Sequence, residues 1–451
     1  MSLFLAMVIV VVSSGSIPVL GRPQQYYDGR HLMQISLDGG SPQLTDSNLR
    51  LEEVASGLEN PTAMAFLGDS GDDIFVIERN NGNVKLVIID GEIQDEPLID
   101  VEVANNNGTN ERGLLGMAVI DATDETAAAA ANSIEATATY VFLYFTESGG
   151  EDGDDDKGVV PTDNRLYRNQ LTRGQNNSGI TIMDSQLLLD LPAIPGPRYN
   201  GVPILATYEN VDNNSNNTTA VATITIYLMI GDLDHRKTQA QNFEDGSPPD
   251  GTGGILRIDS EGNPFPDAIL VDEEDPDSSM LQYYYAYGIR NSFGMDFDPV
   301  TGNLWDTENG PDFGDEINLV EPGFNSGWAD VQRLISKLEE NLDEDNVVGV
   351  GDVEDVELID FSRGNYSDPE FVWQIPVGVT SIKFFNSPNF GEQYQNDMFV
   401  GDIKNGILYN FDLNENRTGL ELDGALADKV ADSNDDRVIS FLALGLMALQ
   451  T

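Results

Sequence analysis

Four short segments of the sequence combine charged side chains with glycine turns, a combination that can present a reactive or ligand-binding group at the end of a strand. In chain order they are residues 110–116 (NERGLLG), 197–201 (PRYNG) with a strand that ends at Asp232, 287–294 (YGIRNSFG) continuing to Trp328, and 400–406 (VGDIKNG). Taken alone, each segment is explained equally well without a function, as a glycine turn with acidic caps, with Arg290 as an ion-pair partner for nearby carboxylates. If they are functional, their chemistry is that of oxygen ligands for a hard cation and of cationic groups for an anionic ligand.

The content of cysteine and histidine limits this chemistry. The 451 residues contain no cysteine, and the only histidines are His31 and His235. A disulfide, a thiolate metal site, a cysteine nucleophile and a His-rich zinc or copper site within the chain are therefore excluded.

The charge of the chain excludes further partners. It has 23 Lys and Arg against 77 Asp and Glu, a net charge of −54, so most of the surface repels nucleic acid and anionic membranes. Such a surface suits a saline habitat and attracts divalent cations such as calcium. Charge alone establishes neither.

The rest of the chain indicates an all-β fold. Short apolar runs are separated by Gly, Asn and Asp turns at the spacing of strands. An amphipathic helical pattern is found only at residues 329–341. Strands are expected at residues 62–67, 74–77, 84–88, 140–145, 223–230, 254–258, 303–305, 397–400 and 407–411.

A loose repeat within this pattern predicts how the strands are arranged. Residues 62–87, 294–319 and 380–411 each contain three strands joined by Gly, Asn or Asp turns. One sheet unit that recurs, and that cannot bury its faces alone, is typical of a β-propeller. The length after residue 46 fits six blades of roughly 65 residues each.

The N-terminal residues predict export. Residues 3–12 form an apolar run followed by small residues; about ten apolar residues suit a secretory signal and fall short of the roughly twenty of a membrane span. No Lys or Arg precedes the run, so a retained N-terminal anchor and a buried first strand stay as alternatives. We expect a signal peptide or anchor at residues 1–21, a linker at 22–45 and one propeller domain at 46–451, in a secreted or extracytoplasmic protein that contacts membrane only through that anchor.

Together and in this order, the four segments resemble the soluble quinoprotein sugar dehydrogenases of the glucose/sorbosone dehydrogenase family. The resemblance extends from about Gly57 to about Phe411, and its most specific part is GIRNSFGMDFDPVTGNLWDTENGPDFGDEINLVEPGFNSGW at residues 288–328. It implies a six-bladed β-propeller with pyrroloquinoline quinone (PQQ) and Ca²⁺ at the axial mouth.

The resemblance also implies which residues bind the cofactor. Arg290 and Asn291 match the pair that touches the quinone, and Lys404 matches the lysine that meets its carboxylates. Glu111 falls where the family places a polar Gln or Glu beside the cofactor, and Asn200 belongs to the turn that faces it. Because the cofactor is a tricarboxylate, an otherwise anionic protein must supply local cations to bind it.

Two calcium sites are implied in the same way. The backbone carbonyls of Gly310 and Pro311 match ligands of the catalytic Ca²⁺, which polarises the quinone carbonyl. Glu316, with the carbonyl of Ser326, matches a second, structural calcium site.

The sequence departs from the family at the catalytic base. In the family, a histidine in a short turn takes the sugar hydroxyl proton, whereas residues 199–202 here read YNGV. Tyr199, with an ordinary pKa near 10, is a poor base at neutral pH. His235 is the next candidate, against the alternative of a surface loop histidine, and Asp232 is a further one.

The sequence also departs from the family at its C-terminus. The family continues for another strand pair that closes the ring, whereas this chain runs through the apolar residues 438–446 to Thr451. We expect an abbreviated closing blade, or else a sequence that is truncated or shifted in frame there.

The leading interpretation is an exported oxidoreductase that oxidises aldose sugars or related alcohols and passes electrons to an external acceptor. Arg290, Asn291 and Lys404 favour it. The alternative is a non-catalytic propeller that binds a carbohydrate or a protein, which Tyr199 favours. A calcium-dependent hydrolase, such as a lactonase on a similar propeller, is a third.

Overall fold

The computed structural model describes residues 8–11, 43–46, 52–67, 73–88, 92–104, 111–121, 139–149, 161–173, 180–194, 200–211, 221–233, 236–271, 280–332, 358–388, 391–432 and 441–444. These residues form β-strands, loops and four single-turn 3₁₀ helices, η3 (Gln239–Gln241), η4 (Leu281–Tyr283), η7 (Glu392–Tyr394) and η8 (Gly424–Leu426). No helix in this described part is long and apolar enough to cross a bilayer. Most of residues 329–341, where a helix was predicted, lie outside it.

The strands form five large sheets and a two-stranded one. Each large sheet begins as an antiparallel meander, in which strands that are consecutive in the chain pair side by side. The first two sheets contain β4 (Pro61–Leu67), β5 (Asp73–Glu78), β6 (Asn83–Ile88) and β7 (Ile99–Asp100), and then β8 (Leu114–Asp121), β9 (Thr139–Ser148), β10 (Pro161–Arg173) and β11 (Ile180–Pro192).

The other three large sheets gain strands from distant segments. The third contains β12 (Ile204–Val211), β13 (Val221–Ile230), β14 (Gly254–Asp259), β15 (Tyr284–Tyr287), β19 (Phe324–Asn325) and β20 (Asn365–Tyr366). The fourth contains β16 (Ser292–Phe297), β17 (Leu304–Glu308), β18 (Asp315–Val320), β21 (Phe371–Trp373) and β25 (Val430–Ala431). The fifth contains β22 (Val379–Phe384), β23 (Met398–Asp402), β24 (Ile407–Phe411), β26 (Phe441–Leu444) and β2 (Gln43–Leu44).

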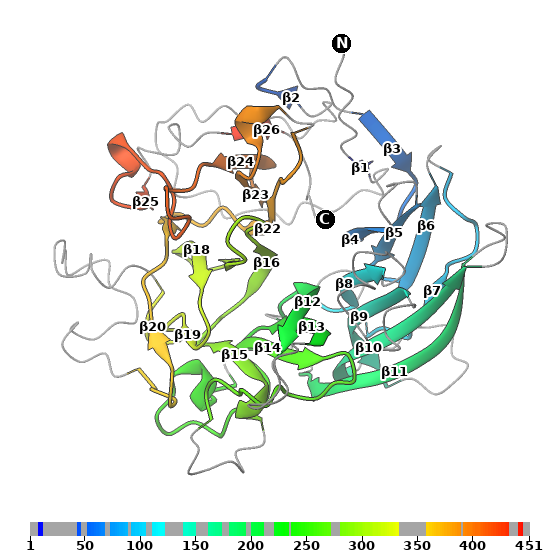
Figure 1. Cartoon of the computed structure of the whole chain (residues 1–451), viewed down its shortest axis with the longest axis horizontal. Coiled ribbons are helices and arrows are strands. Elements are labelled where there is room, and N and C mark those ends of the chain that lie inside the picture. Colours follow the sequence, from blue (N-terminus) through cyan, green and yellow to red (C-terminus); the bar gives the residue numbers. More distant parts are fainter. Residues whose placement is uncertain are drawn as a thin grey trace, which may run out of the picture.

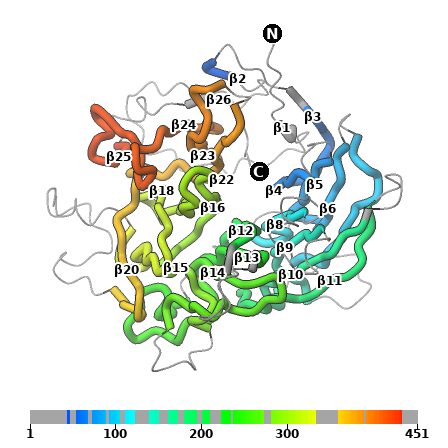
Figure 2. Tube along the Cα trace, viewed as in Figure 1, coloured from blue at the N-terminus to red at the C-terminus, as the bar shows by residue number. Residues whose placement is uncertain are grey.

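The five large sheets stand around a common axis, and their first strands follow one another in chain order (Figures 1 and 2). The first strand of each sheet is innermost, and β4, β8, β12, β16 and β22 follow one another around the axis. This is the radial arrangement of a β-propeller, and the three repeats predicted from sequence are β4–β6, β16–β18 and β22–β24. Six blades remains a prediction, because the described residues supply five sheets of this kind.

The apolar core lies between neighbouring sheets. One cluster joins the first two sheets around Phe75 and Leu143, a second joins sheets two to four around Tyr144 and Leu228, and a third joins the fourth and fifth around Trp373. Strands buried on both faces read as continuous apolar runs, whereas the outermost strand β11 alternates exposed and partly buried residues. Packing between sheets therefore fixes their relative positions and holds the loops at their ends.

Segments near both ends of the chain add to this ring. Strand β26 pairs with β24, and β2 pairs with β26, so residues 43–44 and 441–444 extend the fifth sheet. Within the N-terminal apolar run, β1 (Val8–Val11) pairs in parallel with β3 (Glu52–Ser56). Export and the proposed domain limits stay predictions.

Candidate functional site

All the described candidate residues lie at one end of the ring, in loops or at the start of a strand. Each innermost strand starts at this end, and the turn between the second and third strands of a sheet returns to it because consecutive strands are antiparallel. Some candidates precede an innermost strand: Glu111 precedes β8, Asn200 precedes β12, and Arg290 and Asn291 precede β16. Others follow a strand that ends here: Asp232 follows β13, Gly310 and Pro311 follow β17, Ser326 follows β19, and Lys404 follows β23. Glu316 lies at the start of β18. We call this end the mouth.

Hydrogen bonds join three of the predicted cofactor residues across the second, third and fourth sheets. The Asn200 amide Nδ2 donates to the Glu111 carbonyl at 2.5 Å, and Asn291 Nδ2 donates to Glu111 Oε2 at 3.4 Å. Asn291 Oδ1 in turn accepts from the backbone N–H of Gly201 at 3.3 Å. Both asparagines are buried, so these three side chains occupy one fixed part of the mouth.

Arg290 is held by contacts on several sides. Its Nη1 donates to the carbonyls of Asn309 at 2.6 Å and Gly310 at 3.0 Å, while its backbone N–H donates to Glu308 Oε1 at 2.7 Å. The guanidinium carbon lies 5.3 Å from the centre of the Trp328 ring, within cation–π range. The structure therefore brings Arg290 directly against Gly310, a predicted calcium ligand.

Asp315 connects Gly310 to the loop of Lys404. Asp315 Oδ1 accepts from the Gly310 N–H at 3.0 Å, and Oδ2 accepts from the Gly378 N–H at 2.6 Å. The Lys404 backbone N–H donates to Val377 at 3.1 Å, and its exposed ammonium donates to the Pro376 carbonyl at 2.7 Å. Burial raises the pKa of Asp315, against the opposing effects of these amides and of the Lys404 charge. Arg290 thus contacts Gly310 directly, whereas Lys404 lies close enough to Asp315, the acceptor of the Gly310 N–H, for its charge to act on that carboxylate.

Carboxylates line one face of β17 and β18 behind Arg290. Asp306 pairs with Asn318 and Glu308 with Glu316, so the four side chains share one face, and all are buried. Ser326 Oγ donates to Glu308 Oε2 at 2.6 Å. Burial raises the pKa of Glu308 to about 7, and burial followed by repulsion from Glu308 raises that of Glu316 well above its usual range.

The oxygen atoms of this face have the chemistry of a calcium site. Neither carboxylate oxygen of Glu316 or Asp306 has a hydrogen-bond partner among the described residues, and hard cations prefer such oxygens. Within the same part of the chain, no three acidic or histidine side chains converge enough to bind a metal by themselves. Carbonyl ligands such as Ser326 are therefore needed to complete a site. Gly310 is buried and Pro311 is exposed.

Asp232 lies beside Arg290, fully buried. Its backbone N–H donates to the Arg290 carbonyl at 2.9 Å, and its Oδ2 accepts from Trp328 Nε1 at 2.8 Å. Tyr199 and His235, the other two candidate bases, lie outside the described residues. The structure thus places Asp232 in the mouth and leaves the assignment of the base a prediction.

Sequence reasoning missed several residues of the mouth. Trp328 was noted only as the end of a segment, and Asp315 only as part of a quoted motif, although each bridges two candidates. Asp306 and Glu308 could have been found from the sequence, because they alternate with Trp305 and Thr307. In a strand this period of two puts both carboxylates on one face.

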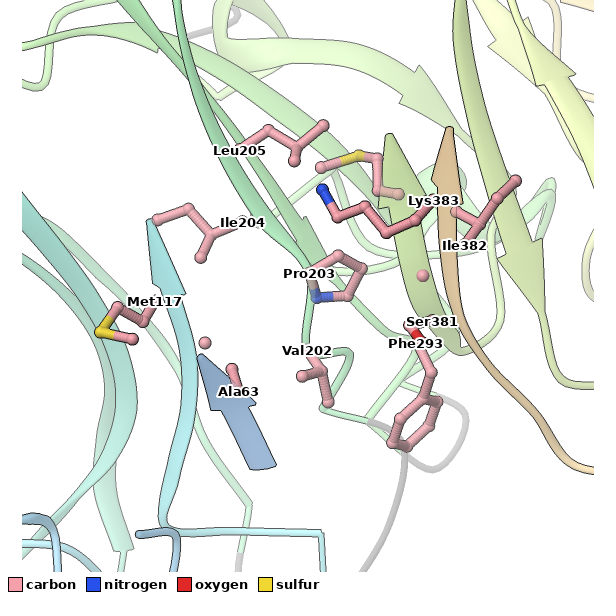
Figure 3. Close-up of a pocket in the computed structure, with 13 residues that line it drawn as sticks. Ala63, Met117, Val202, Pro203, Ile204, Leu205, Phe293, Ser381, Ile382 and Lys383 are labelled. Carbon is pink, nitrogen blue, oxygen red and sulfur yellow. The ribbon is translucent and has the colours of Figure 1, made fainter. Parts of the chain in front are cut away.

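A narrow pocket lies on the axis beneath the mouth loops (Figure 3). Residues at or near the start of the five innermost strands line it, including Met117, Val202, Phe293 and Ser381. Most of the lining is apolar, with Lys383 as the charged member. Polar and charged groups are therefore concentrated in the loops above the pocket.

Comparisons with known proteins identify the family and the fold. A family model described as glucose/sorbosone dehydrogenase matches residues 204–432. The uncharacterized protein slr1608 of Synechocystis is 24% identical over 395 residues, 83% of this chain and 78% of that protein. Aldose sugar dehydrogenase YliI of Escherichia coli is 28% identical over 179 residues, 40% of this chain and 42% of that protein. The PQQ-bound aldose sugar dehydrogenase of Streptomyces coelicolor shares the fold, with a TM-score of 0.52, 19% identity, and coverage of 90% of this chain and 97% of that one.

Proposed function

This chain belongs to the glucose/sorbosone dehydrogenase family, and we propose that it is an exported oxidoreductase that uses PQQ and Ca²⁺ to oxidise aldose sugars or related alcohols. Electrons would pass to an external acceptor. The observation that carries the proposal is a pair of cationic side chains in the mouth of a protein of net charge −54: Arg290 donates to the Gly310 carbonyl, and the charge of Lys404 acts on Asp315, which binds the Gly310 N–H. Cations placed among the carboxylates of this mouth can bind an anionic cofactor that the rest of so acidic a surface would repel.

The residues of the mouth fit a tricarboxylate quinone. Arg290 and Lys404 would bind its carboxylates through charge-assisted hydrogen bonds, and the amides of Asn200 and Asn291 with Glu111 would contact its polar edge. When bound, the quinone supplies a two-electron acceptor for the hydride of the alcohol carbon. The residues themselves supply binding, orientation and a local positive charge.

Calcium fits the oxygen atoms described above. The Gly310 carbonyl, with that of Pro311, would bind the ion beside the cofactor, and Glu316 with the Ser326 carbonyl would bind a second ion between the third and fourth sheets. The orphaned, buried oxygens of Glu316 support this second site, because an unpaired buried carboxylate is costly unless a cation neutralises it.

The hydroxyl proton of the substrate must go to a base in the mouth. Tyr199 holds the position of the family's histidine, and His235 and Asp232 are the other candidates. Asp232 is ordered by Trp328 and lies against the Arg290 backbone. General-base catalysis contributes about 10² to 10⁴ in rate, so the choice among the three decides how active the enzyme is.

Tyr199 also supports a second candidate function. A chain without the family's histidine would keep the scaffold and the two cations of the mouth while losing the dehydrogenase step. In that case the protein is a binding propeller for a carbohydrate or a protein.

Titration of the purified protein with PQQ in the presence of Ca²⁺ tests the proposal. We expect uptake of one quinone per chain, with Arg290→Ala and Lys404→Ala each weakening it about ten- to a hundredfold through loss of a charge-assisted contact. Arg257→Ala and Lys85→Ala are matched controls. Arg257 pairs with Glu209 and Asp267, Lys85 donates to the Asp95 carbonyl, and both should leave uptake unchanged. Absence of uptake by the wild-type protein contradicts the proposal.

A further inference from the structure

The three tryptophans of the chain differ in what their indole N–H groups contact. Trp305, Trp328 and Trp373 are all buried. The N–H groups of Trp305 and Trp373 have no hydrogen-bond partner among the described residues. Trp328 Nε1 donates to Asp232 Oδ2 at 2.8 Å, across 96 residues of sequence. Its bond to a carboxylate distinguishes Trp328 from two otherwise comparable core tryptophans.

The same indole ring also faces Arg290. The guanidinium carbon lies 5.3 Å from the ring centre, and the Asp232 backbone N–H donates to the Arg290 carbonyl. Arg290, Asp232 and Trp328 therefore form a closed circuit of three contacts. One rigid ring sets where both the acid and the cation lie.

The backbone of Trp328 is itself anchored. Asn242 and Asn325 exchange two amide hydrogen bonds of 2.9 Å, and Asn242 Nδ2 also donates to the Trp328 carbonyl at 2.9 Å. The Trp328 N–H donates to Gly288 at 2.9 Å. Gly288 has φ +69°, and a Cβ there would lie 2.0 Å from Asn325 Oδ1, so glycine is required. These contacts keep the ring from shifting.

We propose that Trp328 is a positioning residue of the mouth, which orients the Asp232 carboxylate through its N–H and the Arg290 guanidinium through its ring face. This assignment rests on the proposed function. The two parts of the indole have separable effects, because the donor acts on Asp232 and the face acts on Arg290. The donor should therefore govern turnover, and the face should govern cofactor binding.

Two substitutions separate these effects, with PQQ plus Ca²⁺ and D-glucose as probes. Trp328→Phe keeps an aromatic face and removes the donor. It should change the quinone Kd by less than about threefold and lower kcat about tenfold or more, since small misplacements of reacting groups are costly. Trp328→Leu removes both the aromatic face and the N–H donor, so it should also weaken quinone binding about tenfold. Trp373→Phe, a buried tryptophan without the acidic partner, is the control and should leave both quantities within about twofold.

A double-mutant cycle shows whether Trp328 acts through Asp232. In an Asp232→Asn background, Trp328→Phe should lower kcat little further, because the carboxylate that it orients is gone. Full additivity, or a Trp328→Phe kcat equal to that of Trp373→Phe, would overturn the assignment while leaving quinone uptake by the wild type intact. Wild-type protein that takes up no PQQ would overturn the proposed function and this assignment with it.

Discussion

Replacing Glu316 by glutamine should stabilise the calcium-free protein and abolish its response to calcium. Glu316 is buried, faces Glu308 across the β17–β18 pair, and has no hydrogen-bond partner for either carboxylate oxygen among the described residues. A substitution at a buried polar position is normally destabilising. Glu316→Gln should instead be stabilising, because the glutamine amide keeps the shape of the side chain and removes a charge that burial and the neighbouring carboxylates disfavour.

The expected magnitudes follow from general values. An unsatisfied buried polar group costs about 1–3 kcal/mol, and more when charged; because glutamine stays polar, the substitution removes only the extra cost of the charge, on the order of 1–3 kcal/mol. Calcium at a hundred times its Kd stabilises the folded state by about 2.7 kcal/mol. At about 2.1 cal/mol/K of unfolding entropy per residue, a chain of 451 residues changes its Tm by roughly 1 °C per kcal/mol. We therefore expect Tm to rise by roughly 1–3 °C in Glu316→Gln with EDTA, and by roughly 3 °C in the wild type on adding calcium.

The pH dependence of this effect has a definite sign. Burial, and then repulsion by Glu308 and Asp306, raises the pKa of Glu316, so the folded state binds its proton more tightly than the unfolded state. The loss of folding stability that Glu316 causes is absent below the usual carboxyl pKa and grows as the pH rises toward the pKa of Glu316 in the folded state. The advantage of Glu316→Gln should therefore be larger at pH 7 than at pH 4.

Thermal melts without quinone, in EDTA and in millimolar Ca²⁺, measure both quantities. Glu321→Gln, at an exposed position just after β18, is the matched control and should behave as wild type in both buffers. A Glu316→Gln variant that melts lower than wild type in EDTA, or that keeps the wild-type gain with calcium, would contradict this prediction.

Two other predictions concern stability and catalysis. Asp298 is buried at the β16–β17 turn and accepts two hydrogen bonds from Arg417, at 2.7 and 2.8 Å. Burial alone would raise the pKa of Asp298, but the bonds from Arg417 outweigh burial and hold this pKa below its usual value. Asp298→Asn should cost about 3–5 kcal/mol at pH 7 by breaking a buried pair, and the difference from wild type should shrink as pH falls through that lowered pKa; denaturant melts that show no pH dependence would contradict this. In catalysis, Tyr199→His should raise turnover of an aldose by 10-fold or more if Tyr199 faces the quinone, whereas no change there together with complete loss in His235→Ala would make His235 the base.

The sequence was informative wherever the signal was local. Alternation of apolar residues and glycine turns predicted β4–β6, β16–β18 and β22–β24, because a strand and its hairpin partner are close in the chain. The sequence also predicted that the candidate residues lie at strand ends. It could not show which of these residues contact one another across neighbouring sheets.

Contacts between sheets depend on packing that no local pattern encodes. Trp328 meets Asp232 across 96 residues, and Asp315 meets Gly378 across 63. Both contacts arise because neighbouring sheets bring their loops to the same end of the ring. The roles of Asp315 and Trp328 became visible only once those loops were placed together.

We propose that the mouth binds a quinone that an aldose can reduce. A single turnover without oxygen tests this proposal: protein loaded with PQQ and Ca²⁺ is mixed with D-glucose and then with other aldoses while the quinone absorbance is recorded. We expect reduction of one quinone per chain, at a slow rate because Tyr199 stands where the family has a histidine. A quinone that is bound stoichiometrically and stays oxidised with every aldose would contradict it and favour a binding propeller.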